Sequence, residues 1–127
     1  MTLTNLPNGI QTFLVENNAI YKNGSYSLGD NGKVFYSDVD GTVFTLPPIT
    51  SGQTFTFVNT APDGTAKLSI SPNGSDGIMY AGSSTDNKDL INTKLTAKMG
   101  DKVTIYNIAS ADYWSVDQIN GTWAKEA

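Results

Sequence analysis

The stretch Gln53-Thr54-Phe55-Thr56-Phe57-Val58-Asn59 alternates polar and aromatic side chains over most of its length. Successive side chains of an extended strand point to opposite faces, so Phe55 and Phe57 share one face. Thr54 and Thr56 share the other face. The stretch therefore predicts a β-strand whose aromatic face lies in a hydrophobic core.

The same two-residue period recurs on both sides of this stretch. In residues 102–108, Val103 and Ile105 are expected to point inward, whereas Lys102 and Thr104 point outward. Residues 88–98 are also predicted as a strand, because their threonines and asparagine disfavour the alternative of a helix. Further strands are predicted at residues 11–16, 19–22, 25–28, 33–36, 42–46, 67–71, 78–80, 113–116 and 122–125.

Eight Asn-Gly or Asp-Gly pairs punctuate the chain. Such pairs favour the positive φ angles of tight hairpin turns. Their number in a chain of 127 residues predicts an all-β fold whose neighbouring strands are joined by hairpins. The pairs begin at Asn8, Asn23, Asn31, Asp40, Asp63, Asn73, Asp76 and Asn120.

The chain is expected to form one domain, a single antiparallel β-sandwich or barrel over residues 10–127, preceded by an extended arm at residues 1–9. The arm contains Leu3, Leu6 and Pro7 without a strand period. It is interpreted either as a frayed terminus or as a segment that orders on a neighbouring subunit. Because the first residues form neither a lysine-rich segment nor a long apolar run, we expect no signal peptide and no membrane anchor.

The composition excludes several classes of catalytic site. The chain has no histidine and no cysteine, and all 8 basic residues are lysine. A Ser-His-Asp triad, a thiolate nucleophile, a zinc site of the usual kind and a disulfide therefore cannot form. The net charge is -4 and the lysines are scattered, so no nucleic-acid partner is expected. We expect no cofactor, no metal and no enzymatic activity.

The aspartates allow interpretations as metal ligands and as catalytic acids. Asp38-Val39-Asp40-Gly41 contains part of a calcium loop, but its glycine comes too early, and Ile49 stands where that loop needs glutamate. A glycosidase needs two carboxyl groups at a set separation, yet the two glutamates lie near the ends and most aspartates stand in turn sequences. Turn formation is the preferred interpretation, and a small glycan hydrolase using two aspartates is the weaker alternative.

The two tryptophans allow two interpretations. Trp114 and Trp123 each follow a turn signal, so they can close the end of the core or form a platform that stacks on sugar or binds protein. Closure of the core is the preferred interpretation.

Several stretches together form a recognisable pattern. They are YSLGDNGKVF (26–35), GTVFTLPP (41–48), GQTFTFVN (52–59) and NTKLTAKMGD (92–101), followed by Trp114 and by GTWA (121–124). The pattern resembles a small β-domain of tailed-bacteriophage virion proteins, found as capsid decoration (cement) protein and as a module of fibre-like proteins. The resemblance covers residues 20–127 and implies a jelly-roll-like sandwich or barrel that assembles as a trimer or dimer on an icosahedral head.

The resemblance implies a structural virion protein. It would bind the major capsid protein on the outer surface of the head, after assembly in the host cytoplasm, and stabilise contacts between capsomers. A chain of 127 residues leaves no room for the long shaft of a fibre, which favours decoration. The arm would contact the shell or a neighbouring subunit through Thr2, Leu3, Asn5, Leu6 and Pro7.

The alternative is a fibre or receptor-binding module that contacts host glycan. Its stacking residues would be aromatic side chains near the C-terminal half of the domain. The candidates are Tyr80, Trp114 and Trp123.

Overall fold

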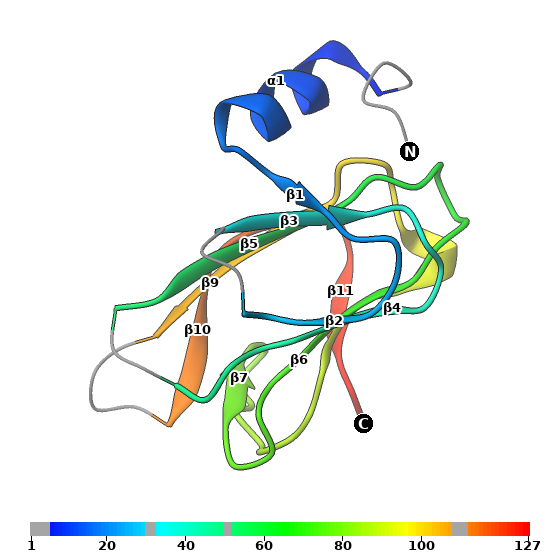
Figure 1. Ribbon diagram of the computed structural model, residues 1–127. Coiled ribbons are helices and arrows are strands. Elements are labelled where there is room, and N and C mark those ends of the chain that lie inside the picture. Colours follow the sequence, from blue (N-terminus) through cyan, green and yellow to red (C-terminus); the bar gives the residue numbers. More distant parts are fainter. Residues whose placement is uncertain (1–5, 30–32, 50–51, 108–111) are drawn as a thin grey trace.

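Two β-sheets stacked face to face form the body of the protein, and one α-helix covers part of one sheet (Figure 1). The computed structural model describes residues 6–29, 33–49, 52–107 and 112–127. Sheet A contains, in spatial order, β1 (Ile20–Tyr21), β3 (Val34–Ser37), β5 (Thr54–Asn59), β9 (Lys102–Asn107), β10 (Tyr113–Asn120) and β7 (Gly77–Met79). Sheet B contains β11 (Trp123–Lys125), β8 (Leu90–Asn92), β6 (Leu68–Ser71), β4 (Thr42–Thr45) and β2 (Tyr26–Ser27). The all-β class is confirmed.

The predicted strands overlap the observed ones, with one exception and one partial success. Residues 11–16 are helical, as part of α1 (Asn8–Glu16). Residues 88–98 form a strand only at Leu90–Asn92 and then a 3-10 turn, η2 (Lys94–Thr96). Leu95 in this turn is 86% exposed, so the alternation of residues 94–98 does not mark a half-buried strand.

The first six strands alternate between the two sheets, so the chain winds around the core in three turns. Between two neighbouring strands of one sheet, the chain passes through a strand of the opposite sheet. The second strand therefore runs in the same direction as the first. The neighbours β1-β3-β5 and β2-β4-β6 are therefore parallel. The prediction of an antiparallel sandwich is wrong, because five of the nine strand pairings are parallel. The two sheets also remain separate, without closing into a barrel.

The Asn-Gly and Asp-Gly turns lead the chain from one sheet to the other. Asp40-Gly41 joins β3 of sheet A to β4 of sheet B, and Gly41 adopts φ +83°, as a turn glycine can. Asn120-Gly121 likewise joins β10 to β11. The prediction that such pairs form hairpins is wrong for every pair between described strands, since the one same-sheet connection, β9 to β10, contains no such pair. It is also wrong for Asn8-Gly9, which begins helix α1 (Asn8–Glu16). The pair at Asn31 lies outside the described residues.

Helix α1 replaces a predicted strand because its apolar residues fit a helical stripe. Ile10, Phe13 and Leu14 recur at i, i+3 and i+4, and Pro7 precedes the helix, where its missing N–H costs no hydrogen bond. Leu14 is buried, and Ile10 and Phe13 are half-buried. The stripe packs on sheet A, so tertiary packing overrides the β-propensity of residues 11–16. The predicted boundary at residue 9 falls inside this helix.

The space between the sheets is filled by aromatic side chains. Phe44 of sheet B lies 5.1 Å from Phe57 and 6.0 Å from Phe35 of sheet A, measured between ring centroids. Trp114 packs on Phe55 at 5.8 Å. These contacts stabilise the sandwich, since aromatic side chains bury large apolar areas.

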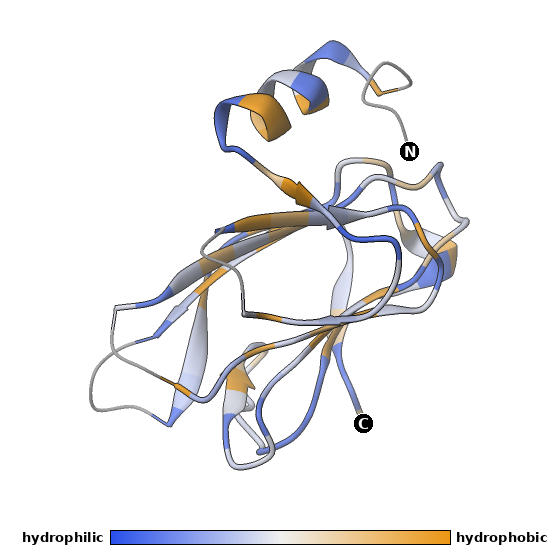
Figure 2. Ribbon diagram, in the orientation of Figure 1, coloured by the Kyte–Doolittle hydropathy of each residue, from blue (hydrophilic) through white to orange (hydrophobic). Residues whose placement is uncertain are grey.

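A second, smaller cluster lies between α1 and the outer face of sheet A. It buries Leu6 and Leu14 against Val34, Tyr36 and Val58. Because β3 and β5 are thus covered on both faces, they read as nearly continuous runs of buried residues. Figure 2 shows the apolar segments of α1 above the apolar strands of this sheet.

Edge strand β1 is tied to the loop after β3 by a side-chain hydrogen bond. The Tyr21 hydroxyl donates to Asp38 Oδ1 at 2.6 Å. This hydrogen bond, together with burial and the Asp38 charge, raises the pKa of Tyr21 from 10.0 to about 12. The interaction favours the folded state while Tyr21 is protonated.

We expect the stabilisation from Tyr21 to be complete below about pH 10 and to disappear as the pH rises to about 12. The Tyr21→Phe variant should therefore lose less of its free energy of unfolding across this range than the wild type. Denaturant unfolding at several alkaline pH values measures the difference. In Asp38→Asn, tyrosinate absorbance should show Tyr21 ionising at a lower pH. An unchanged titration would contradict the assignment.

Candidate functional site

The outer face of sheet A carries a patch of uncharged side chains beside α1. The pairing registers place them in two rows across β5, β9, β10 and β7. One row contains Thr56, Thr104 and Gln118, and the next contains Thr54, Tyr106, Ser115 and Met79. We call these seven residues the threonine face.

Hydrogen bonding and burial order this face. The hydroxyl groups of Thr56 and Thr104 lie 2.8 Å apart across the β5–β9 pair. Tyr106 is half-buried between Thr54 and Ser115, its partners on the two neighbouring strands. Thr54 is exposed, whereas Ser115 is half-buried. Thr56 is buried, so the face offers a partner the exposed Thr54, the partly exposed Thr104 and Ser115, and the ring of Tyr106.

The strand registers place charged side chains only at the margins of this face. Lys102 of β9 is one row closer to α1, where it pairs with Val58 and Asn120. Its Nζ lies 4.0 Å from the ring centroid of Phe13, a cation–π contact. Asp117 is exposed at the β-bulge of β10. A partner would therefore meet a neutral centre with a charged rim.

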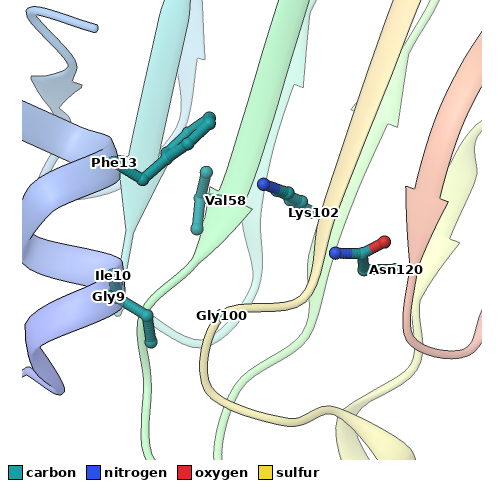
Figure 3. Close-up of a pocket in the computed structure, with 7 residues that line it drawn as sticks. All are labelled: Gly9, Ile10, Phe13, Val58, Gly100, Lys102 and Asn120. Carbon is teal, nitrogen blue, oxygen red and sulfur yellow. The ribbon is translucent and has the colours of Figure 1, made fainter. Parts of the chain in front are cut away.

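A small groove separates α1 from this part of sheet A (Figure 3). Its volume is about 110 Å³. In Figure 3, Phe13, Val58 and Lys102 lie side by side between the helix and the strands. The groove marks the boundary between the helix-covered part of sheet A and the threonine face. Its lining residues are Gly9, Ile10, Phe13, Val58, Gly100, Lys102 and Asn120.

The predicted arm residues are only partly described. Leu6 is 4% exposed and packs in the cluster beneath α1, so it belongs to the core of its own chain. Pro7 is exposed and precedes α1. Thr2, Leu3 and Asn5 lie outside the described residues. The prediction that Leu6 contacts the shell or a neighbouring subunit is therefore wrong.

The aromatic residues of the glycan alternative do not form one surface. Trp114 is fully buried and Trp123 is 5% exposed, which confirms closure of the core. The Trp123 Nε1 donates to the Asn120 carbonyl at 2.9 Å. Tyr80 is half-buried and forms an isolated bridge with Ser83. Neither indole presents a face on which a sugar could stack.

Two carboxyl groups and a lysine gather where the end of sheet B meets β7. Lys125 donates from Nζ to the carbonyls of Ile78 and Lys88, at 2.7 and 3.1 Å, and so bridges the two sheets. Burial lowers the pKa of Lys125 and raises that of Asp89. Glu126 accepts a hydrogen bond from the Asp89 amide. These contacts hold β11 against β7 and β8.

Among the described residues, no group of three or more carboxylates is placed to hold a metal ion.

The threonine face was not identified as a site in the sequence. The alternation of residues 102–108 correctly predicted an outward Thr104, and it also places Tyr106 outward. What the sequence lacked was the register that sets Tyr106 between Thr54 and Ser115. A surface assembled from four strands, of which only β9 and β10 are consecutive in the chain, leaves no contiguous motif.

Of the helices formed by the described residues, none has the length and apolar character needed to cross a lipid bilayer.

Comparison with known proteins gives no family assignment. No protein-family model matches the sequence, and no curated protein matches it.

Proposed function

We propose that the chain is a non-enzymatic structural protein of a tailed-bacteriophage virion, a decoration subunit that binds the major capsid protein on the outer surface of the head. The observation that supports this proposal best is the threonine face, a neutral sheet surface with hydroxyl groups and Tyr106 at its centre. The resemblance of the turn and strand motifs supports it as well. The mixed sheets depart from an antiparallel jelly roll, so the resemblance rests on local motifs.

The physical requirements of decoration fit such a surface. A bridge between capsomers gains its effect from contact area, of roughly 1,000–2,000 Å² for a stable interface, and needs no chemistry. Neutral hydroxyl groups form hydrogen bonds that salt screens less than exposed ion pairs. The subunit would act on the virion surface as a dimer or trimer, after assembly in the host cytoplasm.

We expect the purified protein to bind undecorated heads of the phage that carries the gene and to raise their resistance to heat. In Thr54→Lys, binding should weaken at least about tenfold, because the new charge loses hydration when the interface closes. The matched control is Ala124→Lys, on an exposed position of sheet B, which should bind as the wild type does. Cosedimentation with heads measures both.

Two outcomes would contradict the proposal. Failure of the wild type to bind heads would exclude the decoration role. Equal binding by Thr54→Lys and Ala124→Lys would exclude the threonine face as the contact. Retention of the wild type on a glycan array would instead support the fibre or receptor-binding alternative. Its aromatic contact would then be Tyr80 or Tyr106, since Trp114 and Trp123 are buried.

A further inference from the structure

The groove between α1 and sheet A has an apolar side and a polar side. Ile10 and Phe13 of α1 and Val58 of β5 form the apolar side. Lys102 of β9 and Asn120 of β10, which are partners in the strand register, form the polar side. In Figure 3, the Lys102 side chain lies between Val58 and Asn120. A ligand with one apolar end and one polar end would match this arrangement.

The two polar side chains of the groove have no hydrogen-bond partner among the described residues. The Lys102 Nζ contacts the ring of Phe13, but it donates none of the described side-chain hydrogen bonds and takes part in neither described ion pair. The Trp123 indole donates to the backbone carbonyl of Asn120, which leaves the side-chain amide of Asn120 unpaired within the described part of the chain. Both side chains can therefore donate hydrogen bonds to a ligand.

The charge of the groove is positive. Lys102 is the charged residue that lines it, and no carboxylate does so. Asp101, the neighbour of Lys102 in the sequence, is buried elsewhere and accepts hydrogen bonds from the Asn92 side chain and the Lys98 backbone. The Lys102 charge is thus not neutralised within the groove, so a ligand with one negative charge would complement it.

The volume of the groove limits the size of the apolar end. This volume is about 110 Å³. An apolar cavity of about 150 Å³ holds one benzene molecule, whereas drug-sized ligands fill pockets of about 300–1,000 Å³. The groove therefore fits a short aliphatic chain and no larger ligand.

We propose that this groove binds a carboxylate group carried on a short aliphatic chain. The carboxylate accepts hydrogen bonds from Lys102 Nζ and from the Asn120 side-chain amide, while the aliphatic chain packs on Ile10, Phe13 and Val58. One ammonium group offsets one negative charge, so a monocarboxylate fits better than a phosphate dianion. Both a free short-chain acid and the C-terminal leucine of a peptide have this chemistry. The inference does not depend on a virion role.

Titration of the nitrogen-15-labelled protein with sodium isocaproate, followed by NMR, tests the proposal. We expect saturable shifts of the backbone amide signals of Gly9, Gly100, Lys102 and Asn120, with sodium chloride at equal ionic strength as the reference. Isocaproamide has the same chain without the charge, so it should bind at least about tenfold more weakly. Absence of saturable shifts at these signals, or equal binding of the two ligands, would overturn the proposal.

Two variants test the polar side of the groove. Lys102→Met retains an unbranched side chain but removes the charge, and should weaken isocaproate binding at least about tenfold. Asn120→Asp places a second carboxylate beside the ligand and should weaken binding as well. The matched control is Lys67→Met, at an exposed lysine outside the groove, which should bind as the wild type does. Wild-type affinity in Lys102→Met would overturn the proposal.

A peptide that ends in leucine distinguishes the two sources of the ligand. The peptide with a free C-terminal carboxylate is compared with isocaproate and with the same peptide in amidated form. Tighter binding of the free peptide than of isocaproate supports the proposal with a chain end as the ligand. Weaker binding of the free peptide supports it with a free acid as the ligand. Equal binding of the free and amidated peptides at the groove would contradict recognition of the carboxylate.

Discussion

Replacing Phe57 with alanine is expected to lower the free energy of unfolding by about 3–5 kcal/mol. Phe57 is fully buried at the centre of the core. Its ring centroid lies 6.0 Å from that of Phe35, 5.1 Å from that of Phe44 and 6.4 Å from that of Phe55. Truncation removes contacts with both sheets at once and leaves a cavity that their hydrogen-bonded strands cannot close.

Denaturant unfolding measures this effect. Because small domains are stable by only about 5–15 kcal/mol, a loss of this size populates the unfolded state of Phe57→Ala at 37 °C, so the two proteins are compared at low temperature. The matched control is Val15→Ala, which truncates a side chain that is 61% exposed on α1 and should change stability by less than about 0.5 kcal/mol. A loss below about 1 kcal/mol for Phe57→Ala would contradict the central position of this ring.

The two-residue period around Phe57 predicted which side chains face the core, but it could not predict the strand pairing. An alternating strand has the same pattern whether its neighbour runs parallel or antiparallel. Asp40-Gly41 and similar turns allow a sharp bend, but they do not specify whether the next strand stays in the same sheet. The close sheet-to-sheet packing of Phe44 and Phe57 supplies that choice.

The N-terminal segment shows a different limit. Residues 11–16 are rich in residues that favour strands, and the apolar Val15, which is exposed, obscures the helical spacing of Ile10, Phe13 and Leu14. The helical stripe is favourable only because Val34 and Val58 lie on the outer face of sheet A. The same apolar cluster also buries Leu6. Such a long-range partner cannot be identified before the sheet is known.

A buried polar network joins the ends of the two sheets near the turn after β10. The side-chain Nδ2 of Asn59 in β5 donates to Asn92 Oδ1 of β8 at 2.9 Å. Asn92 Nδ2 donates to Asp101 Oδ2 at 3.1 Å, and the backbone N–H of Lys98 donates to the same oxygen at 2.9 Å. The backbone of Gly121 passes directly over the Asp101 carboxyl group. Because each of these buried side chains has hydrogen-bond partners, the network fixes the loops in one arrangement.

The Gly121→Ala variant is expected to lose about 2–5 kcal/mol of unfolding free energy. Gly121 adopts φ +94°, which costs an alanine about 1–2 kcal/mol, and the added Cβ would overlap the carboxyl group of Asp101. The control is Gly41→Ala, at φ +83°, where no atom lies within 4 Å of the new Cβ. This control isolates the backbone strain, so its loss should stay near about 1–2 kcal/mol.

A double-mutant cycle separates the overlap from the strain. Asp101→Ala alone leaves the part-buried backbone amide of Lys98 and one buried N–H of the Asn92 side chain without their acceptor. The unpaired buried group of Asn92 costs about 1–3 kcal/mol. The substitution also removes the atoms that the Gly121→Ala methyl group would meet. The double variant should therefore lose clearly less stability than the sum of the single variants, by at least about 0.5 kcal/mol. Additive losses would mean that the turn moves away from Asp101 without resistance, and that the network does not hold the β10–β11 connection in place.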